Sequence, residues 1–416
     1  MRKVNRAYKT ELKPNKGQRQ LLEQHCGTAR FAYNWGLNLR IEAYKSKSEE
    51  KLNAISLHKK LNSLKKEEFP WMYQVSKCAP QEALRDLDKA YQGFFRRLKT
   101  RKSGEAPGFP RFKSKHDSKQ SFRLTGTIKV LDKNTIQLPN LGKLKLKEKG
   151  YFPQDGIKIL SATVSSRAGR WFVSISVEEE IPLPKFGISS EAIGVDLGSK
   201  FLGVASTPEV FDKGYCKNPK AYRSLEAKLQ QLQRKHSKKK KGSKNRKKSS
   251  EKLAKIHYKI SNVRKDVIHK MTSALAKAKP KAVIIEDLAV KNMMKNHNLA
   301  KSVADASFGE IRRLLDYKCD WGDIELAVAD RWFPSSKTCS SCGNKKDELK
   351  LSERIYECGA CGLSLCRDLN AALNLVNYYF EQLAPTSSSG GSNACGDGGL
   401  PPSMKQEVES SLSCTA

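Results

Sequence analysis

The sequence predicts an α+β protein of several domains, and three observations carry this prediction. Apolar residues at three- and four-residue spacing fill residues 15 to 100, between segments that alternate as β-strands do. A second pattern of short, wholly apolar strands and long helices starts near residue 190. Two pairs of closely spaced cysteines follow near residues 340 and 360. At 416 residues, the chain is long enough for two or three domains with their own cores.

The charge of the chain indicates its type of partner. It has 78 Lys and Arg against 43 Asp and Glu, a formal net charge of +35. Such a chain repels itself unless it binds a polyanion, and nucleic acid offers dense phosphate charge together with counterion release. A protein that is only basic and soluble is the alternative, but solubility needs a much smaller net charge. The composition therefore predicts a nucleic-acid-binding protein.

Membrane and secreted proteins do not fit the sequence. No run approaches the roughly 18 to 20 apolar residues that cross a bilayer. The N-terminal stretch MRKVNRAYKTELKPNKGQ is basic but lacks the apolar core of a secretory signal. Cys26, Cys78, Cys216 and Cys319 lie outside the cysteine pairs, and unpaired thiols are typical of a reducing compartment. We therefore expect a cytoplasmic protein without a membrane partner, associated with the nucleoid when it is bound to DNA.

A helical block splits the first β-rich segment. Residues 3–13, KVNRAYKTELK, alternate loosely and predict one strand. After the helices, the Gly- and Pro-rich stretch SGEAPGFPRFKSK at 103–115 ends the helical pattern. Three β-like runs follow, SFRLTGTIKVLD, TIQLPNLGKLKL and ATVSSRAGRWFVSISVEE. With the N-terminal strand they predict a small barrel or sheet, which the proline-containing linker IPLPKFGISS separates from the next unit.

The next unit opens with EAIGVDLGSKFLGVAST, two apolar strands joined by a short turn. Two long helical stretches follow and predict an antiparallel hairpin over residues 220–278. Ten of the fifteen residues from Arg234 to Lys248 are Lys or Arg, so the hairpin tip is a candidate anion-binding feature. A solvated flexible loop would carry the same charge. The Ser-, Gly- and Pro-rich residues 384–416 predict a disordered tail.

The cysteine pairs have the spacing of a metal site. TCSSCG contains Cys339 and Cys342, and ECGACG contains Cys358 and Cys361, with fifteen residues between the pairs. Each C-x2-C knuckle turns two thiolates toward one point, so the four predict one tetrahedral structural zinc ion in a zinc ribbon. Cys366 would be a fifth thiol, and we expect it to be a buried apolar side chain instead.

Three acids form a second candidate site. Asp196 ends the apolar run AIGVD, and Glu286 ends another, within KAVIIED, where Asp287 could take its place. Asp368 opens the helix-like DLNAALNLVNYYF, where an acid is also a favourable first-turn residue. Each acid alone is ambiguous. If the three converge, they can hold two divalent cations about 3.5–4 Å apart, an arrangement that activates water for phosphodiester cleavage.

These motifs together resemble a known family. IGVDLGSKFLGVAS, VIIEDL and CRDLNAALN look like the three split motifs of a RuvC-like nuclease, which has an RNase H fold. RFAYNWGL, ALRDLDKAYQGFFRR and PGFPRFKSK precede them, and the cysteine pairs lie between the second and the third. This order resembles TnpB, the RNA-guided nuclease family of bacterial insertion sequences, ancestor-like to type V CRISPR effectors. The resemblance runs from about residue 3 to about residue 380.

The resemblance implies a role for each candidate residue. The three acids are the expected catalytic residues and the ligands of two magnesium ions, and the four paired cysteines are the ligands of one structural zinc ion. Gln81 and Thr125 occupy positions where family members read a short motif beside the target. Three cations of PRFKSK are expected to contact phosphates: Arg111, Lys113 and Lys115. The family usually has Asp where this chain has Cys366; that position is not the catalytic acid, so we expect activity to survive.

The resemblance also implies a division into a wedge domain, a helical recognition lobe and a nuclease domain. We expect the wedge domain at 1–14 and 106–182, the recognition lobe at 15–105, the nuclease domain at 190–335 and 365–383, and the zinc ribbon at 336–364. The full fold class is then an RNase H-like α/β nuclease with a helical hairpin insertion and a zinc ribbon, joined to a β-barrel wedge domain that contains the helical lobe.

The expected function is that of an RNA-guided DNA endonuclease from a transposable element. Family members bind an RNA from the element's own end, pair its guide with a target strand and require a short motif beside the target. The expected partners are therefore a guide RNA and double-stranded DNA, with a monomer on one RNA. The alternatives are a repressor that is guided but does not cut, and a transposase or transposase accessory protein. The three intact acids argue against the repressor.

Overall fold

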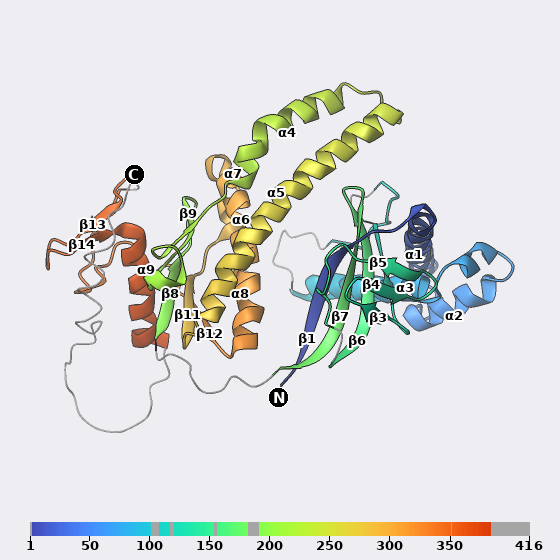
Figure 1. The fold of residues 1–416 in the computed structure, drawn as a ribbon, viewed down its shortest axis with the longest axis horizontal. Helices are drawn as coiled ribbons and strands as arrows, with labels where there is room; N and C mark the ends of the chain where they lie inside the picture. Colours follow the sequence, from blue (N-terminus) through green and yellow to red (C-terminus); the bar gives the residue numbers. More distant parts are fainter. Residues whose placement is uncertain are drawn as a thin grey trace. The chain divides into compact units, whose positions relative to one another are not determined.

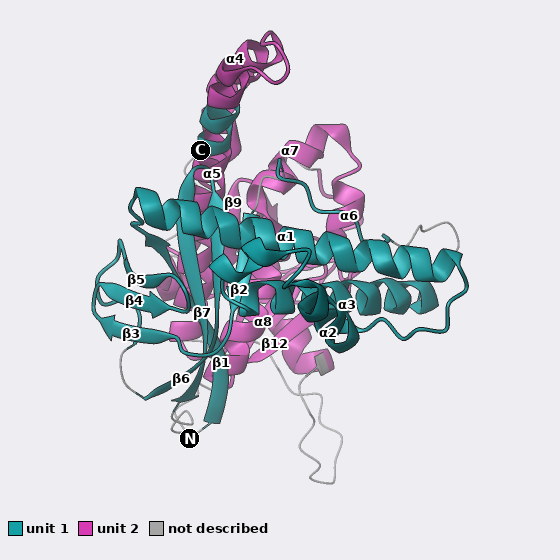
Figure 2. Cartoon of the chain, turned by 90° about the vertical axis from the view of Figure 1, so that its right-hand side faces the viewer, with its two compact units in different colours: residues 1–183, 250–255 teal, residues 184–249, 256–416 magenta. Residues whose placement is uncertain are grey.

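The computed structural model describes residues 2–100, 108–116, 120–153, 156–181, 191–350 and 352–383. The chain divides into two compact units, residues 1–183 with 250–255 and residues 184–249 with 256–416 (Figure 2). The predicted disordered tail at 384–416 lies outside the described residues, and so does the linker after residue 181.

The helices of the first unit pack on one another and on a sheet, forming a single core. They are α1 (Lys16–Lys45), α2 (Ala54–Leu64), the 3-10 helix η1 (Pro70–Gln74) and α3 (Cys78–Thr100). Asn15 starts α1 with a capping box, since its side chain accepts from the Gln18 N–H and the Gln18 side chain accepts in return. Gly36 lies where α1 meets its neighbours, because a Cβ there would lie 2.8 Å from Leu84 and 3.3 Å from Leu57.

The strands of the first unit form two antiparallel sheets. The larger has the order β1 (Arg2–Leu12), β7 (Arg170–Ile181), β6 (Ile157–Arg167) and β2 (Gln120–Leu124). The smaller contains β3 (Lys129–Asp132), β4 (Thr135–Leu138) and β5 (Gly142–Lys145). The N-terminal strand thus joins strands from beyond the helical block, as its alternation predicts. A bridge between Leu12 and Leu146 links the sheets, and the described strands do not close into a hydrogen-bonded ring.

The second unit is built on a five-stranded mixed sheet. Its order is β10 (Tyr215–Lys217), β9 (Phe201–Ala205), β8 (Ala192–Asp196), β11 (Ala282–Glu286) and β12 (Glu325–Ala329). β9 is antiparallel to both of its neighbours, β10 and β8, whereas β8, β11 and β12 run parallel to one another. Parallel strands need long crossovers, and the chain between β8 and β11 contains the helical hairpin.

Helices cover both faces of this sheet (Figure 1). The end of α5 (Lys244–Lys277), with α7 (His297–Ala306) and α8 (Phe308–Gly322), packs on the face that presents Ile193 and Ile285. The opposite face, with Ala282 and Ile284, packs on α9 (Arg367–Tyr378) and the π-helical turn that follows it, η3 (Tyr379–Leu383). Burial on both faces explains why these strands read as continuous apolar runs.

The remaining elements are short or project from the sheet. α4 (Ala221–Ser237) forms the predicted hairpin with α5, and the basic turn between them is closed by Arg246, which donates to the Lys239 carbonyl at 2.8 Å. The short elements are η2 (Pro208–Val210), α6 (Val290–Met293), β13 (Ile355–Glu357) and β14 (Ser364–Cys366). Among the described residues, no helix has both the length and the apolar character needed to cross a membrane.

Candidate functional site

Two neighbouring strands end on acids at one edge of the second unit's sheet. β8 and β11 are parallel, with Val195 opposite Ile285, so Asp196 and Glu286 are the last residues of adjacent strands. Asp368 lies in the first turn of α9, the helix that packs on this sheet. All three carboxylates are partly buried. The fold thus gathers three acids that are far apart in the sequence.

The charges of the three acids act on one another. Burial raises the pKa of the Asp196 carboxyl well above its ordinary value, the charges of Glu286 and Asp368 raise it further, and the positive charge of Arg367 opposes them. The three carboxylates are not packed as tightly as the paired cysteines: among the described residues, only the four cysteines form a group of three or more ligand atoms within 4.8 Å of one another. A carboxylate with a raised pKa beside two others is typical of a site that functions with bound cations.

Gly194 lets α9 approach the sheet closely. A Cβ on Gly194 would collide with the carbonyl oxygen of Ala372 and lie 3.1 Å from the Leu375 Cβ. Glycine is therefore required where β8 meets α9, two residues before Asp196. The Gly194 N–H donates to the Ser206 hydroxyl at 3.1 Å, and Ser206 directly follows β9, the strand next to β8.

The structure distinguishes Glu286 from its neighbour Asp287. The Ser335 hydroxyl donates to Oε1 of Glu286 at 2.6 Å, and the charge of Glu286 reaches Asp196. Asp287 instead accepts from Arg312 at 3.2 Å and from the Arg331 guanidinium. An acid neutralised by two arginines is a poor candidate for a cation ligand.

Residues 335–340, here named the connecting segment, run from the Glu286 contact to the first cysteine knuckle. Asn374 on α9 donates to its backbone twice, to the Ser335 carbonyl at 2.7 Å and to the Thr338 carbonyl at 2.6 Å. Asn370, one turn earlier, donates to the same Thr338 carbonyl at 2.7 Å. The helix that carries Asp368 therefore also holds the connecting segment.

Two further hydrogen bonds continue this contact. The Ser340 N–H donates to Oδ1 of Asn370 at 3.0 Å, and Asn377 donates to the Ser340 carbonyl at 3.0 Å. Asn370, Asn374 and Asn377 are spaced four and three residues apart and so share one helix face; we name them the asparagine ladder. The sequence signal for these contacts is the repeated Asn in NAALNLVN, at four- and three-residue spacing.

The four paired cysteines converge as their spacing predicts. Their sulfurs all lie within 4.8 Å of one another, with Cys339 3.6 Å from Cys361 and Cys342 3.6 Å from Cys358. Four thiolates around one zinc ion at about 2.3 Å are separated by about 3.8 Å, so this cluster fits a tetrahedral zinc ion. The four-cysteine cluster has the donor set and the geometry of a structural zinc site.

The turns of the two knuckles explain their glycines. Gly343 and Gly362, each directly after a second cysteine, have φ values of 73° and 74°, which glycine adopts without strain. Backbone N–H groups of Cys361 and Ala360 point at the Cys358 sulfur and lower the pKa of its thiol to about 6. Tyr356 is fully buried, and its hydroxyl proton lies between two carbonyls that flank the first knuckle, those of Lys337 at 3.2 Å and Asn344 at 3.3 Å.

Cys366 is a buried apolar side chain, as its position outside the pairs predicts. It packs with Val204, Leu365, Leu369 and Leu373. It also occupies the N-cap of α9, where its side chain makes no capping hydrogen bond. The helix thus starts without the cap that an aspartate would supply at this position.

The predicted nucleic-acid contacts all lie in the first unit. Gln81 is in the first turn of α3, and the Cys78 thiol of the same turn donates to the Thr125 carbonyl at 3.3 Å, so Gln81 and Thr125 belong to adjoining segments. Arg111, Lys113 and Lys115 are exposed in residues 108–116. Asn34 on α1 fixes this stretch, since it accepts from the Lys113 N–H at 2.8 Å and donates to the Lys113 carbonyl at 2.9 Å.

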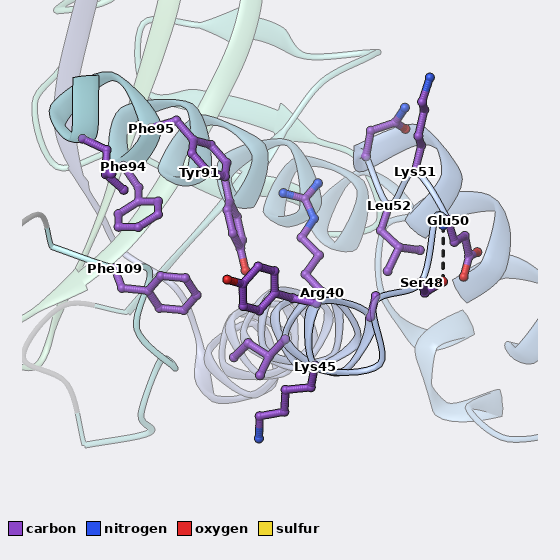
Figure 3. Close-up of a pocket in the computed structure, with 15 residues that line it drawn as sticks. Arg40, Lys45, Ser48, Glu50, Lys51, Leu52, Tyr91, Phe94, Phe95 and Phe109 are labelled. Carbon is purple, nitrogen blue, oxygen red and sulfur yellow. Dashed lines mark hydrogen bonds between the residues drawn. The ribbon is translucent and has the colours of Figure 1, made fainter. Parts of the chain in front are cut away.

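The first unit also contains a hollow of about 970 Å³, and none of the predicted nucleic-acid contacts lines it (Figure 3). Aromatic rings from α3 and the 108–112 stretch gather there, and Arg40 of α1 lies 4.7 Å from the Tyr91 ring centre. Phe109 meets Phe94 edge to face at 5.3 Å and remains 44% exposed. The aromatic side chains that line the hollow offer surfaces for stacking.

Three family models match successive parts of the chain. A model described as a probable transposase, OrfB_IS605, matches residues 162–297, and a Cas12f1-like TNB domain matches residues 308–375. A helix-turn-helix domain model matches residues 1–49, where the described residues form one strand and one long helix, β1 and α1.

Relatives match nearly the whole chain. A Streptomyces pristinaespiralis protein named "Putative RNA-guided DNA endonuclease" is 35% identical over 96% of this chain and 92% of its own length. An Escherichia coli K12 protein of the same description, InsQ, is 30% identical over 89% of this chain and 91% of its own length. The solved structure of a Cas12f1 with sgRNA and target DNA has a TM-score of 0.53 at 18% identity, covering 87% of this chain and 83% of that one, which shows a shared fold. The chain therefore belongs to the TnpB family of RNA-guided DNA endonucleases.

Proposed function

We propose that this protein is an RNA-guided DNA endonuclease that hydrolyses phosphodiester bonds with Asp196, Glu286 and Asp368 as its catalytic acids. The observation that carries the proposal is the convergence of these carboxylates at one edge of the second unit's sheet, where their charges raise the pKa of Asp196. The mixed sheet, covered by helices on both faces, supports an RNase H-like nuclease domain. Family membership supports guidance by an RNA from a transposable element.

The chemistry follows from the residue types. Two magnesium ions held by these oxygens would activate water and stabilise the leaving oxygen, so no covalent protein intermediate is needed. Ser335 orients Glu286 by donating to one of its oxygens, which leaves the other oxygen for a cation. Arg367 favours the charged form of Asp196, the form that can act as a ligand.

The remaining roles extend the proposal to the rest of the chain. The first unit would contain the recognition lobe and the wedge domain, with Gln81 and Thr125 facing the short target-adjacent motif and Arg111, Lys113 and Lys115 on phosphates. Base pairing with the guide would read the target sequence, while protein reads the motif and the shape of the duplex. The cytoplasmic location and the monomeric state stay predictions.

A first prediction concerns zinc. We expect freshly purified protein to contain one zinc ion per chain, and Cys339→Ser to lose it and to lower the melting temperature, because structural zinc contributes folding free energy directly. Metal analysis by mass spectrometry and thermal unfolding measure both effects. Cys366→Ser is the matched control, since it alters a buried cysteine outside the cluster and should retain the zinc. Purified wild-type protein without zinc would contradict the assignment.

A second prediction concerns pH. Because the pKa of Asp196 is raised, the folded metal-free protein keeps this proton to a higher pH than the unfolded chain does. Its contribution to stability is therefore complete below the ordinary carboxyl pKa of about 4 and is lost as the pH rises through the raised value. Magnesium competes with the proton, so we expect magnesium to raise the melting temperature more at about pH 8 than at about pH 6.

The control for this pH dependence is Asp196→Asn, which has no proton to release at this position. Its magnesium-induced shift in melting temperature should be small at both pH values. An equal shift at both pH values in the wild-type protein would contradict the role of Asp196 as a proton-linked ligand.

A further inference from the structure

The four-cysteine cluster and the carboxylates are connected by a short path of hydrogen bonds. The connecting segment touches Glu286 through Ser335 at its first residue, and Cys339 at its fifth is one of the four converging thiols. The candidate zinc site and the candidate nuclease site are thus separated by only a few residues, although the sequence presents them as independent motifs.

The connecting segment is held on both sides of Cys339. Thr338, just before it, accepts from Asn370 and Asn374, and Ser340, just after it, is bonded to Asn370 and Asn377. A displacement of Cys339 therefore strains or breaks hydrogen bonds to α9.

Two asparagines of the ladder are buried, so contact with water does not explain why polar side chains occupy these positions. Asn370 and Asn374 are 0% and 2% exposed, and they lie on the helix that begins with Asp368. A buried amide needs hydrogen-bond partners, and here its partners are backbone carbonyls of the connecting segment. Replacing Asn374 would remove its hydrogen bond to the Ser335 carbonyl and one of the two asparagine hydrogen bonds to the Thr338 carbonyl.

We propose that Ser335 and the asparagine ladder make the zinc ribbon a positioning element for the nuclease acids, so that zinc bound at Cys339 governs how tightly the acids bind their own cations. Ser335 fixes Glu286, and the ladder fixes α9 with Asp368 against the same segment. Ser335, Asn370, Asn374 and Asn377 are positioning residues, since none of them is a ligand in this scheme. The inference rests on the proposed nuclease function.

The first experiment measures cation affinity without catalysis. Titration of the full-length protein with Mn²⁺, followed by electron paramagnetic resonance, reports binding at the carboxylates. We expect Ser335→Ala to weaken Mn²⁺ binding roughly tenfold, the effect typical of removing a hydrogen bond to a metal ligand. Zinc content and guide RNA affinity should remain unchanged. Ser335→Thr keeps the hydroxyl and should restore the affinity, and Ser336→Ala, which removes a hydroxyl from the adjacent residue, should have no effect.

The second experiment tests the link from the ribbon. Cys339→Ser, which alters no carboxylate, should lose zinc and also weaken Mn²⁺ binding, whereas Asn374→Leu should keep its zinc and weaken Mn²⁺ binding. Circular dichroism shows whether each variant is folded. If Asn374→Leu does not fold, the Mn²⁺ affinity of Ser335→Ala still tests the inference. Wild-type Mn²⁺ affinity in Ser335→Ala, or in folded Cys339→Ser without zinc, overturns the inference.

Cleavage assays separate this inference from the proposed function. With cognate RNA, the wild-type complex should cut target DNA, and Ser335→Ala should require roughly tenfold more magnesium for half-maximal cleavage. A wild-type complex that does not cut at any magnesium concentration contradicts the proposed function. If the wild-type complex cuts and the Ser335→Ala complex shows the same magnesium dependence, the inference is wrong but the proposed function stands.

Discussion

Asp196→Ala is expected to abolish cleavage of target DNA while guide RNA binding is retained. The residue ends β8 beside Glu286. Its removal takes away the carboxylate whose pKa the charges of Glu286 and Asp368 raise. Without it, the site cannot hold two cations at the spacing that phosphodiester hydrolysis requires. RNA binding should persist because it depends on basic residues elsewhere in the chain. Plasmid cleavage with cognate RNA, together with a filter-binding assay for the RNA, measures both properties.

The fold provides a matched control for the acids. Glu286→Gln should lose cleavage as Asp196→Ala does, whereas Asp287→Asn changes the next acid along the chain and should leave most activity. Asp287 is bonded to Arg312 and Arg331, and the two charges that raise the pKa of Asp196 are those of Glu286 and Asp368. If Asp196→Ala cuts plasmid at the wild-type rate, the assignment of the three acids as catalytic residues is wrong.

Gly194→Ala is expected to have the second largest effect, because one added methyl group meets helix backbone rather than a flexible side chain. The new Cβ would collide with the Ala372 carbonyl of α9, so either the helix shifts from the sheet or the variant unfolds more easily. Overpacking of this kind costs about 1–3 kcal/mol or more. We expect a lower unfolding midpoint in urea and a loss of cleavage, since α9 carries Asp368.

Gly309→Ala tests whether the effect comes from the contact rather than from the substitution itself. Gly309 lies in α8, and a Cβ there would meet no atom within 4 Å. Alanine favours a helix over glycine by about 1 kcal/mol, so this variant should be as stable as the wild type or slightly more so. If Gly194→Ala is as stable as Gly309→Ala, α9 can move away from β8 without a loss of stability, and the prediction is wrong.

Local patterns indicated the residues of both candidate sites, and the family resemblance was needed to join the three acids into one. Apolar runs that stop at Asp196 and Glu286 are visible because a strand buried on both faces has no polar residue before its end. The cysteine cluster follows from the C-x2-C spacing, and the knuckle turns follow from the glycines after Cys342 and Cys361. Each of these signals is confined to a few consecutive residues.

Contacts between distant segments were not predictable in the same way. Nothing near Ser335 in the sequence indicates that its hydroxyl reaches Glu286, 49 residues earlier. Asn370 and Asn374 read as polar positions on a helix, which pattern arguments place toward water, yet both are buried. Gly194 reads as an ordinary glycine in a strand until the position of α9 is known. The expected barrel likewise depends on strand pairing, and the described strands form two linked sheets.

The place of Asp368 along the chain has a consequence during protein synthesis. α9 follows the basic hairpin, the connecting segment and both cysteine knuckles in chain order, and Asp368 is the last of the three acids to be translated. A nascent or truncated chain that stops before residue 367 carries most of the positive charge but lacks one carboxylate. Under the proposed function, such a product would bind nucleic acid without cutting it, because the third catalytic acid is missing.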